Sequence, residues 1–181
     1  VNGDEIRVLA LSGVGVSHNP ESNMKLASGV APLPQMLSAG VKVGLGTDGC
    51  ASNNNLDLFQ EMDTAAKLHK VYQGDPSLSS AVQIAKMATK GGAAALGMAD
   101  VIGSLEPGKK ADIITIDINQ PHLTPMYEPI FHLVYSARGA DVRDVIIDGR
   151  IVMRDRQLLH VDEQEVMARV REIASRIRGW H

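Results

Sequence analysis

The sequence predicts an α/β fold whose character changes about halfway along the chain, and three observations support this prediction. Residues 13–17 and 41–45 are almost entirely apolar or glycine and do not alternate, which is typical of parallel strands buried on both faces. Helical periodicity precedes, separates and follows these strands, in the order helix, strand, helix, strand, helix. Short alternating segments and turns dominate the second half. We therefore expect residues 1–99 to be part of an α/β barrel and residues 100–181 to form mainly a β-rich lobe.

Proline and glycine separate the elements around the first strand. A helix is expected over residues 4–12, with no obvious residue to cap its start. The strand of residues 13–17 ends at His18-Asn19-Pro20, because proline lacks a backbone donor and biases the residue before it toward an extended conformation. Residues 21–29 predict a polar loop, and residues 32–39 a short helix with proline in its first turn.

The second strand and the helices after it complete the first half. Gly44 and Gly46 in this strand have no side chain, which indicates that another group approaches the backbone closely. Asn54 or Asn55 is expected to cap the next helix, which carries apolar residues at spacings of three and four. Ser77 is expected to cap the helix after that.

The second half predicts a small sheet and two helices. Residues 101–110 predict a strand and a turn, residues 111–118 alternate as a strand, and residues 130–137 predict a short helix. Residues 142–159 predict a hairpin that turns at an Asp-Gly pair.

The chain ends with a predicted amphipathic helix. Asp162 is expected to cap it, and Glu165 lies three residues further on, as in a capping box. Its apolar residues recur at spacings of four and three, so we expect an inner face that consists of Val166, Val170, Ile173 and Ile177.

Composition excludes several classes of function. The formal net charge of −3 and the pI near 6.1 give no basic footprint for nucleic acid or an anionic membrane. The apolar runs are too short to span a bilayer, and the first residues do not resemble a signal peptide. The single cysteine excludes an internal disulfide and favours a reducing, cytoplasmic environment. A small-molecule substrate is the expected partner.

Asp48 is the leading functional candidate. It follows the second strand directly and precedes the polar loop of residues 50–55. An ionised carboxylate at the end of a buried strand is costly unless it is paired or bound to a cation. In barrels of parallel strands, catalytic groups lie at the C-terminal strand ends. We therefore hypothesise that Asp48 is a metal ligand.

The alternative is that Asp48-Gly49 is an ordinary turn, since Asp-Gly after an apolar run is a common hairpin signal. The chain contains a second such pair, Asp148-Gly149, and a matching strand follows that pair at once. A polar loop and a helix follow Asp48-Gly49 instead. This difference favours a functional interpretation of Asp48.

Three motifs resemble a known family. They are SHNPESNMKLASG at residues 17–29, GTDG at residues 46–49 and GSLEPGKKAD at residues 103–112. Their order resembles that in the amidohydrolase superfamily, and the first motif is similar to the branch of 5'-methylthioadenosine/S-adenosylhomocysteine deaminases and related chlorohydrolases. The resemblance extends over essentially the whole chain and does not fix the substrate.

The resemblance implies the last strands and helices of a (β/α)₈ barrel, with the C-terminal portion of a β-sandwich lobe and a terminal helix. One divalent metal, most often zinc and in some members iron, is held there by a His-x-His pair, a later histidine and an aspartate after the last strand. Asp48 matches this aspartate, which implies metal, catalytic and substrate-binding roles. A metal-activated water would displace ammonia or chloride from a purine or triazine ring.

The sequence departs from this family at one point, because it contains neither the His-x-His pair nor a His-x-x-Glu motif. We therefore expect the chain to be the C-terminal part of a longer enzyme, with the other metal ligands outside it, and to be inactive alone. The expected activity of the parent is deamination of an adenosine-type nucleoside. Alternatives are a guanine or 8-oxoguanine deaminase, a triazine chlorohydrolase, or a non-catalytic amidohydrolase-like scaffold. We expect the chain either to form a homo-oligomer or to require the missing N-terminal part.

Other polar residues are weaker candidates. His18 lies at a strand end on the same side as Asp48 and is expected to contact substrate, to support the metal ligands from behind, or simply to cap the strand. Asn23 is expected either to contact substrate or to order its loop. Cys50 has no visible base partner, so we interpret it as a buried small side chain. The remaining histidines have no mutual ligand spacing and are interpreted as surface or interface residues; they are His69, His122, His132, His160 and His181.

Overall fold

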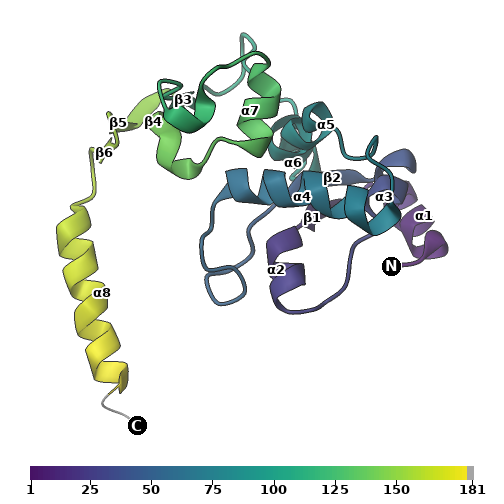
Figure 1. Cartoon of the computed structure of the whole chain (residues 1–181), viewed down its shortest axis with the longest axis horizontal. Helices are drawn as coiled ribbons and strands as arrows, with labels where there is room; N and C mark the ends of the chain where they lie inside the picture. The colour runs from purple at the N-terminus through teal and green to yellow at the C-terminus, as the bar shows by residue number, and fades with distance from the viewer. Residues whose placement is uncertain (179–181) are drawn as a thin grey trace.

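The computed structural model describes residues 1–178, and its first half is organised around two parallel strands (Figure 1). Strand β1 (Gly15–His18) pairs with β2 (Lys42–Leu45), with Gly15 opposite Lys42 and His18 opposite Leu45. The pairing is parallel, so both strands end at the same edge. Helices α1 (Gly3–Ser12), α2 (Pro20–Lys25) and α3 (Leu33–Ser38) alternate with them, which confirms the α/β class.

Three expectations about the first elements are wrong. Asn2 caps α1 in a full capping box with Glu5, so the start of this helix is capped after all. Residues 20–25 form helix α2 rather than the beginning of a polar loop, because Pro20 has the backbone angle that the first helical position requires. Strand β1 is also only partly buried, since β2 is its one neighbouring strand in the described chain.

A run of three helices follows the second strand. Helix α4 (Leu58–Gln73) is capped by Asp57, and α5 (Ala81–Lys86) by Ser80, so the caps expected from Asn54 or Asn55 and from Ser77 are wrong. The turn η1 (Met87–Gly91) is a π-helix that continues α5 into α6 (Gly92–Ala95).

Helix α6 lies against the strands at a distance that only glycine permits. A Cβ atom at Gly44 would lie 2.7 Å from the Cα atom of Gly92. A Cβ atom at Gly46 would collide with the side chains of Ser17 and Asn19. The close approach of another group, predicted at Gly44 and Gly46, is therefore confirmed at both, by backbone at Gly44 and by side chains at Gly46, which lies just beyond β2.

The second half contains a four-stranded antiparallel sheet in the order β3-β4-β5-β6. Strand β3 (Ile113–Ile116) pairs with β4 (Val142–Ile147), and β4 forms a hairpin with β5 (Arg150–Arg154), to which β6 (Gln157–Leu158) is added. The hairpin turns at Asp148-Gly149, as predicted. Residues 101–110 form turns and no strand, so that expectation is wrong.

The two halves share one hydrophobic core. Helix α7 (Pro129–Tyr135) packs against α4 and α5, and short 3₁₀ turns η2 (Pro121–Leu123) and η3 (Gly139–Asp141) flank it. Its Val134 is fully buried in the same cluster as Leu33 and Ile84.

Helix α8 (Glu163–Arg178) stands away from this body at the end of an extended segment (Figure 1). Asp162 accepts hydrogen bonds from the backbone N–H groups of Gln164 and Glu165, so the predicted cap is confirmed. The expected inner face is exposed instead, because none of the described elements packs against it; its exposed residues are Val166, Val170, Ile173 and Ile177.

Candidate active site at the ends of two parallel strands

The candidate site lies where β1 and β2 end. His18 is the last residue of β1, and Asp48 follows the last residue of β2 by three positions. The backbone N–H of Gly46 donates to the carbonyl oxygen of His18 at 3.0 Å, which continues the parallel pairing past the end of β2. The strand order alone therefore brings these two predicted site residues to one edge of the sheet.

Three donors hold the carboxylate of Asp48. The hydroxyls of Ser22 and Ser52 donate to Oδ2 at 2.8 and 2.6 Å, and the backbone N–H of Gly49 donates to Oδ1 at 2.8 Å. These hydrogen bonds, that of Ser52 first, hold the pKa of Asp48 below its ordinary value. Asp48 is therefore a carboxylate at neutral pH, which is the form that a metal ligand must have.

Asp48-Gly49 does not form a hairpin. Asp48 has a left-handed backbone with φ of +59°, and the chain continues through turns and bends into α4; β1 is the one strand of residues 1–178 that pairs with β2. The alternative that this pair is an ordinary two-stranded turn is thus excluded.

Helix α2 holds the loop that carries Asp48. Lys25 donates from Nζ to the carbonyl oxygen of Ala51 at 2.9 Å and to Oδ1 of Asn54 at 2.5 Å. Glu21 accepts from the side-chain amide of Asn55 at 2.9 Å. Ser22, between these two residues, is 3% exposed and reaches Asp48 itself. Consecutive turns of one short helix thus fix both ends and the middle of the loop.

A fully buried glutamate lies beneath this loop. Glu61 of α4 accepts from the amide of Asn53 at 2.6 Å and from the backbone N–H of Glu21 at 3.2 Å. Burial, more than any other cause, raises the pKa of Glu61 to about 7. The sequence analysis did not single out this residue, because an acidic side chain in the first turn of a helix is normally exposed; Ala65, one turn later, is buried on the same helix face.

Two histidines meet at the base of the site. The Nε2 atoms of His18 and His69 lie 3.0 Å apart, with ring centroids at 5.1 Å. His18 is 4% exposed and His69 is not exposed at all, so the interpretation of His69 as a surface or interface residue is wrong. Burial, followed by the charge of His69, lowers the pKa of His18 to about 4, and burial lowers that of His69 too. Both rings are neutral at pH 7.

Other predicted residues lie apart from this cluster. Asn23 is half-buried and lines a separate cavity of about 580 Å³ with residues such as Gln35 and Tyr72, and its role in substrate binding stays a prediction. Cys50 is exposed, so its interpretation as a buried side chain is wrong, because the loop turns it away from the core. His122 pairs with Asp141 at 3.0 Å.

The residues of this chain fit one ligand of a metal site rather than a complete one. Nowhere in residues 1–178 do three or more histidine, cysteine, aspartate or glutamate side chains converge as a metal site would require. An ionised carboxylate with ordered hydrogen bonds is nevertheless a suitable single donor for a divalent cation.

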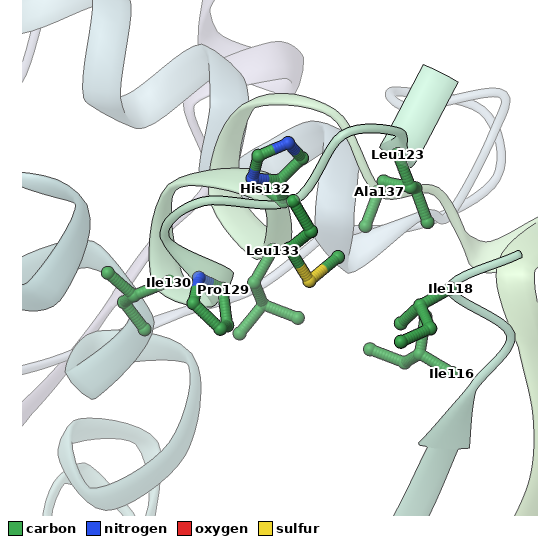
Figure 2. A pocket seen from close by; sticks show the side chains of 9 residues that line it. Ile116, Ile118, Leu123, Pro129, Ile130, His132, Leu133 and Ala137 are labelled. Atoms are coloured by element: carbon green, nitrogen blue, oxygen red, sulfur yellow. The ribbon is translucent and has the colours of Figure 1, made fainter. Parts of the chain in front are cut away.

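A second cavity has a different character. Figure 2 shows side chains at the end of β3 and beyond it, including Ile116 and Ile118, which face Leu133 of α7 across a space of about 200 Å³. Its lining is aliphatic except for His132. It holds no carboxylate and lies apart from Asp48, so it offers no donor set for hydrolysis.

Comparison with known proteins identifies several relatives. The sequence profile described as "Amidohydrolase family" matches residues 1–152. The chain is 59% identical over 174 residues to 5-methylthioadenosine/S-adenosylhomocysteine deaminase of Syntrophobacter fumaroxidans, which covers 96% of this chain and 40% of that protein. It is 54% identical over 173 residues to 5'-deoxyadenosine deaminase of Methanosarcina mazei, with the same shares covered.

Solved structures agree with these relatives. An adenosine deaminase from Xanthomonas campestris with bound zinc superposes with a TM-score of 0.96 at 41% identity, covering 99% of this chain and 41% of that one. Atrazine chlorohydrolase from Arthrobacter aurescens, complexed with zinc, gives a TM-score of 0.85 at 28% identity, covering 93% and 38%.

The share of each protein that these matches cover decides what they establish about this chain. Within residues 1–178, no helix combines the length and apolarity needed to cross a bilayer. The chain spans about two fifths of the length of the curated relatives that it matches. The profile match nevertheless covers most of the chain, and the identities well exceed those of remote homologues. The chain belongs to the amidohydrolase family.

Proposed function

We propose that this chain supplies part of the active site of a metal-dependent deaminase that acts on an adenosine-type nucleoside. The observation that carries the proposal is the ionised carboxylate of Asp48, held by Ser22, Ser52 and Gly49 at the shared end of two parallel strands. The names of the relatives, which are methylthioadenosine/S-adenosylhomocysteine and 5'-deoxyadenosine deaminases, support the substrate class.

In this proposal Asp48 is one ligand of a divalent metal. A carboxylate has about four lone-pair sites on its two oxygens. Three donors occupy sites on Asp48, two of them on Oδ2, so the free site lies on Oδ1. Zinc is the preferred metal, because the adenosine deaminase and the chlorohydrolase among the structural neighbours are described with zinc; iron stays an alternative. Such a metal would lower the pKa of water toward about 7 and so supply hydroxide at neutral pH.

The residues of this chain then have distinct tasks. Asp48 would provide the negative charge that balances the cation, and its carboxylate could accept a proton from the attacking water once one of its three hydrogen bonds is released. Ser22 and Ser52 fix the plane of this carboxylate. In this proposal His18 makes a hydrogen bond to substrate; its neutral ring and its position at the same strand edge support this role.

The proposal includes an arrangement of the whole protein. β1 and β2 would be the last strands of a (β/α)₈ barrel formed mainly by residues 1–99, and residues 100–181 would belong mainly to a β-sandwich lobe. The remaining metal ligands would come from the three fifths of the relatives' length that this chain does not span. A cytoplasmic location and a homo-oligomer stay predictions.

Identity favours nucleoside deamination over the alternatives in the same family. The curated nucleoside deaminases are 52–59% identical to this chain and the adenosine deaminase from Xanthomonas campestris is 41% identical, whereas the chlorohydrolase and the guanine deaminase from E. coli are 28% and 27% identical. A non-catalytic scaffold would have no need of an ionised carboxylate with a free lone pair at a strand edge.

The test uses a polypeptide that contains this chain together with the remaining three fifths of the relatives' length. We expect about one zinc per chain by elemental analysis and ammonia release from 5'-methylthioadenosine, S-adenosylhomocysteine or 5'-deoxyadenosine. The 181-residue chain, assayed in parallel, is expected to release no ammonia. Ammonia release from guanine alone, or zinc content unchanged in Asp48→Asn, would refute the proposal.

A further inference from the structure

The contact between His18 and His69 restricts the tautomers of the two imidazole rings. A neutral imidazole has one N–H donor and one lone-pair acceptor. At 3.0 Å between two Nε2 atoms, one ring must therefore donate from Nε2 and the other must accept there. The donating ring is then the Nε2–H tautomer, and the accepting ring carries its proton on Nδ1.

Two arrangements satisfy this contact, and both contain one ring of each tautomer. The intrinsic preference of imidazole for one tautomer therefore cancels between them. The surroundings of the two Nδ1 atoms decide which arrangement is more stable.

Those surroundings differ sharply. Nδ1 of His69 is fully buried and has no hydrogen-bond partner among the described residues. His69 lies on α4 in a stretch whose buried neighbours include Ala65 and Ala66. His18 terminates β1 at the site and retains a small exposed fraction. An orphaned buried N–H group is rarer in proteins than an acceptor with an unused lone pair. The proton is consequently least favourable on Nδ1 of His69.

We propose that His69 is a positioning residue that donates from Nε2 to Nε2 of His18, and so fixes His18 as the Nδ1–H tautomer. His18 then offers a hydrogen-bond donor, not an acceptor, at the strand edge beside Asp48.

This assignment defines what His18 can do. Its Nε2 lone pair is occupied by His69, and its Nδ1 already carries a proton, so neither nitrogen is available as a general base. The groups that it can bind are acceptors, such as an aromatic ring nitrogen or a hydroxyl oxygen of a nucleoside. This consequence for substrate rests on the proposed function, whereas the tautomer does not.

Both rings must be neutral for the argument to hold. Burial lowers the pKa of each histidine, that of His18 to about 4, so neither is protonated near pH 7. Among the described residues, no carboxylate accepts a hydrogen bond from either ring, in contrast to His122, which contacts Oδ2 of Asp141.

The test is ¹⁵N NMR of the imidazole nitrogens in the 181-residue chain at pH 7 to 7.5, with signals assigned by single substitution of each histidine. We expect a protonated Nδ1 on His18 and a protonated Nε2 on His69. The opposite pattern, or a doubly protonated His18, would overturn the proposal.

Two variants separate positioning from mere packing. His69→Gln keeps an N–H donor at the position of Nε2, and His18 is expected to remain the Nδ1–H tautomer. His69→Leu removes the donor, and the Nε2–H form of His18 is expected to become populated. If both variants fold, by circular dichroism, and His18 has the same tautomer in both, His69 does not set it. If His69→Leu does not fold, the tautomers assigned in the wild-type chain and in His69→Gln still test whether His69 sets the tautomer of His18.

His132→Gln is the matched control, because Nδ1 of His132 contacts the backbone carbonyl oxygen of Glu128, at the start of α7, and not another histidine. It should leave the His18 signals unchanged. In the longer polypeptide, the zinc content and the zinc dependence of ammonia release report separately on the proposed function. A normal zinc content with the opposite tautomer of His18 would refute only the positioning role of His69. Ammonia release that does not depend on zinc, together with the expected tautomer, would refute only the proposed deaminase.

Discussion

The two Asp-Gly pairs of this chain have the same sequence and different structures. Both aspartates have a left-handed backbone, with φ of +59° at Asp48 and +51° at Asp148. Gly149 is also left-handed at +76°, which produces the tight corner between β4 and β5, whereas Gly49 is not. The Asp148 carboxylate forms an exposed ion pair with Lys110, but that of Asp48 is held by three donors. The comparison teaches that the surroundings after the pair, not the pair itself, determine its role.

The largest difference is expected for removal of the two carboxylates. Asp48→Asn in the longer polypeptide should weaken zinc binding by more than the ~100-fold that loss of an outer-shell partner can cost. Asp148→Asn should leave zinc binding unchanged. Competition with a chelator of known affinity measures both. Equal zinc affinity in the two variants would remove the functional distinction between the two corners.

A third carboxylate, Glu61, sharpens the comparison because it is fully buried and accepts a hydrogen bond from a neutral amide, that of Asn53. Its pKa is raised from 4.5 to about 7, so the folded chain retains a proton that the unfolded chain loses. The stability that this proton provides is fully present below pH 4.5 and is lost as the pH rises to about 7. The lost stability is ~3 kcal/mol across this window. Urea unfolding of the 181-residue chain at several pH values measures it.

Glu61→Gln is the matched variant, because it keeps the size of the side chain and one acceptor without the titration. The decrease in the free energy of unfolding between pH 4.5 and 7 should be smaller in this variant than in the unmodified chain. His18 contributes a slope of opposite sign, since its lowered pKa makes stability fall as the pH decreases from 6.5 to about 4. An unchanged profile in Glu61→Gln would show that Glu61 is not the group that titrates.

Substitution of the glycine in each Asp-Gly pair should change the free energy of unfolding by a smaller amount, and the two substitutions should differ. Gly149→Ala places a side chain in a left-handed conformation and should cost about 1–2 kcal/mol. Gly49→Ala meets open space and no such strain, so we expect a change within about 0.5 kcal/mol. Denaturant midpoints of the two variants test this, and a cost at Gly49 equal to that at Gly149 would contradict the backbone argument.

The smallest effect is expected for the ion pair at the hairpin corner. Lys110 and Asp148 are 45% and 59% exposed in their side chains, and exposed pairs contribute about 0–1 kcal/mol. Lys110→Ala should therefore shift the unfolding midpoint only slightly, and 1 M salt should reduce the shift further. A shift larger than that of Gly149→Ala would show that the pair, and not the glycine, stabilises this corner.

The sequence allowed prediction of elements whose local chemistry is decisive. Proline and glycine placed β1, α3 and the hairpin, and the loop and helix after Asp48 distinguished it from a turn. The cap of α4 was assigned to the wrong residue, because Asn54, Asn55 and Asp57 are all good caps and only the path of the loop selects among them.

Tertiary contacts were beyond this reasoning. His69 is 51 positions from His18, and no spacing rule indicates that their rings meet. Glu61 has the appearance of a solvent-exposed first-turn acid, and its burial depends on α2, a helix expected as a loop. The hydrogen bonds from α2 to the Asp48 loop were not predicted for the same reason, although residues 21–29 were expected to form a polar loop that includes Asn23.

The shared core has a consequence for any attempt to divide this molecule. Ile6 and Val142 belong to one hydrophobic cluster, and Leu123 and Val134 fill it from the far side of residue 99. A truncation at that residue would expose to solvent a large part of the apolar surface that each piece now buries against the other. Neither piece is then expected to melt as an independent unit, and residues 1–147 should unfold in a single cooperative transition.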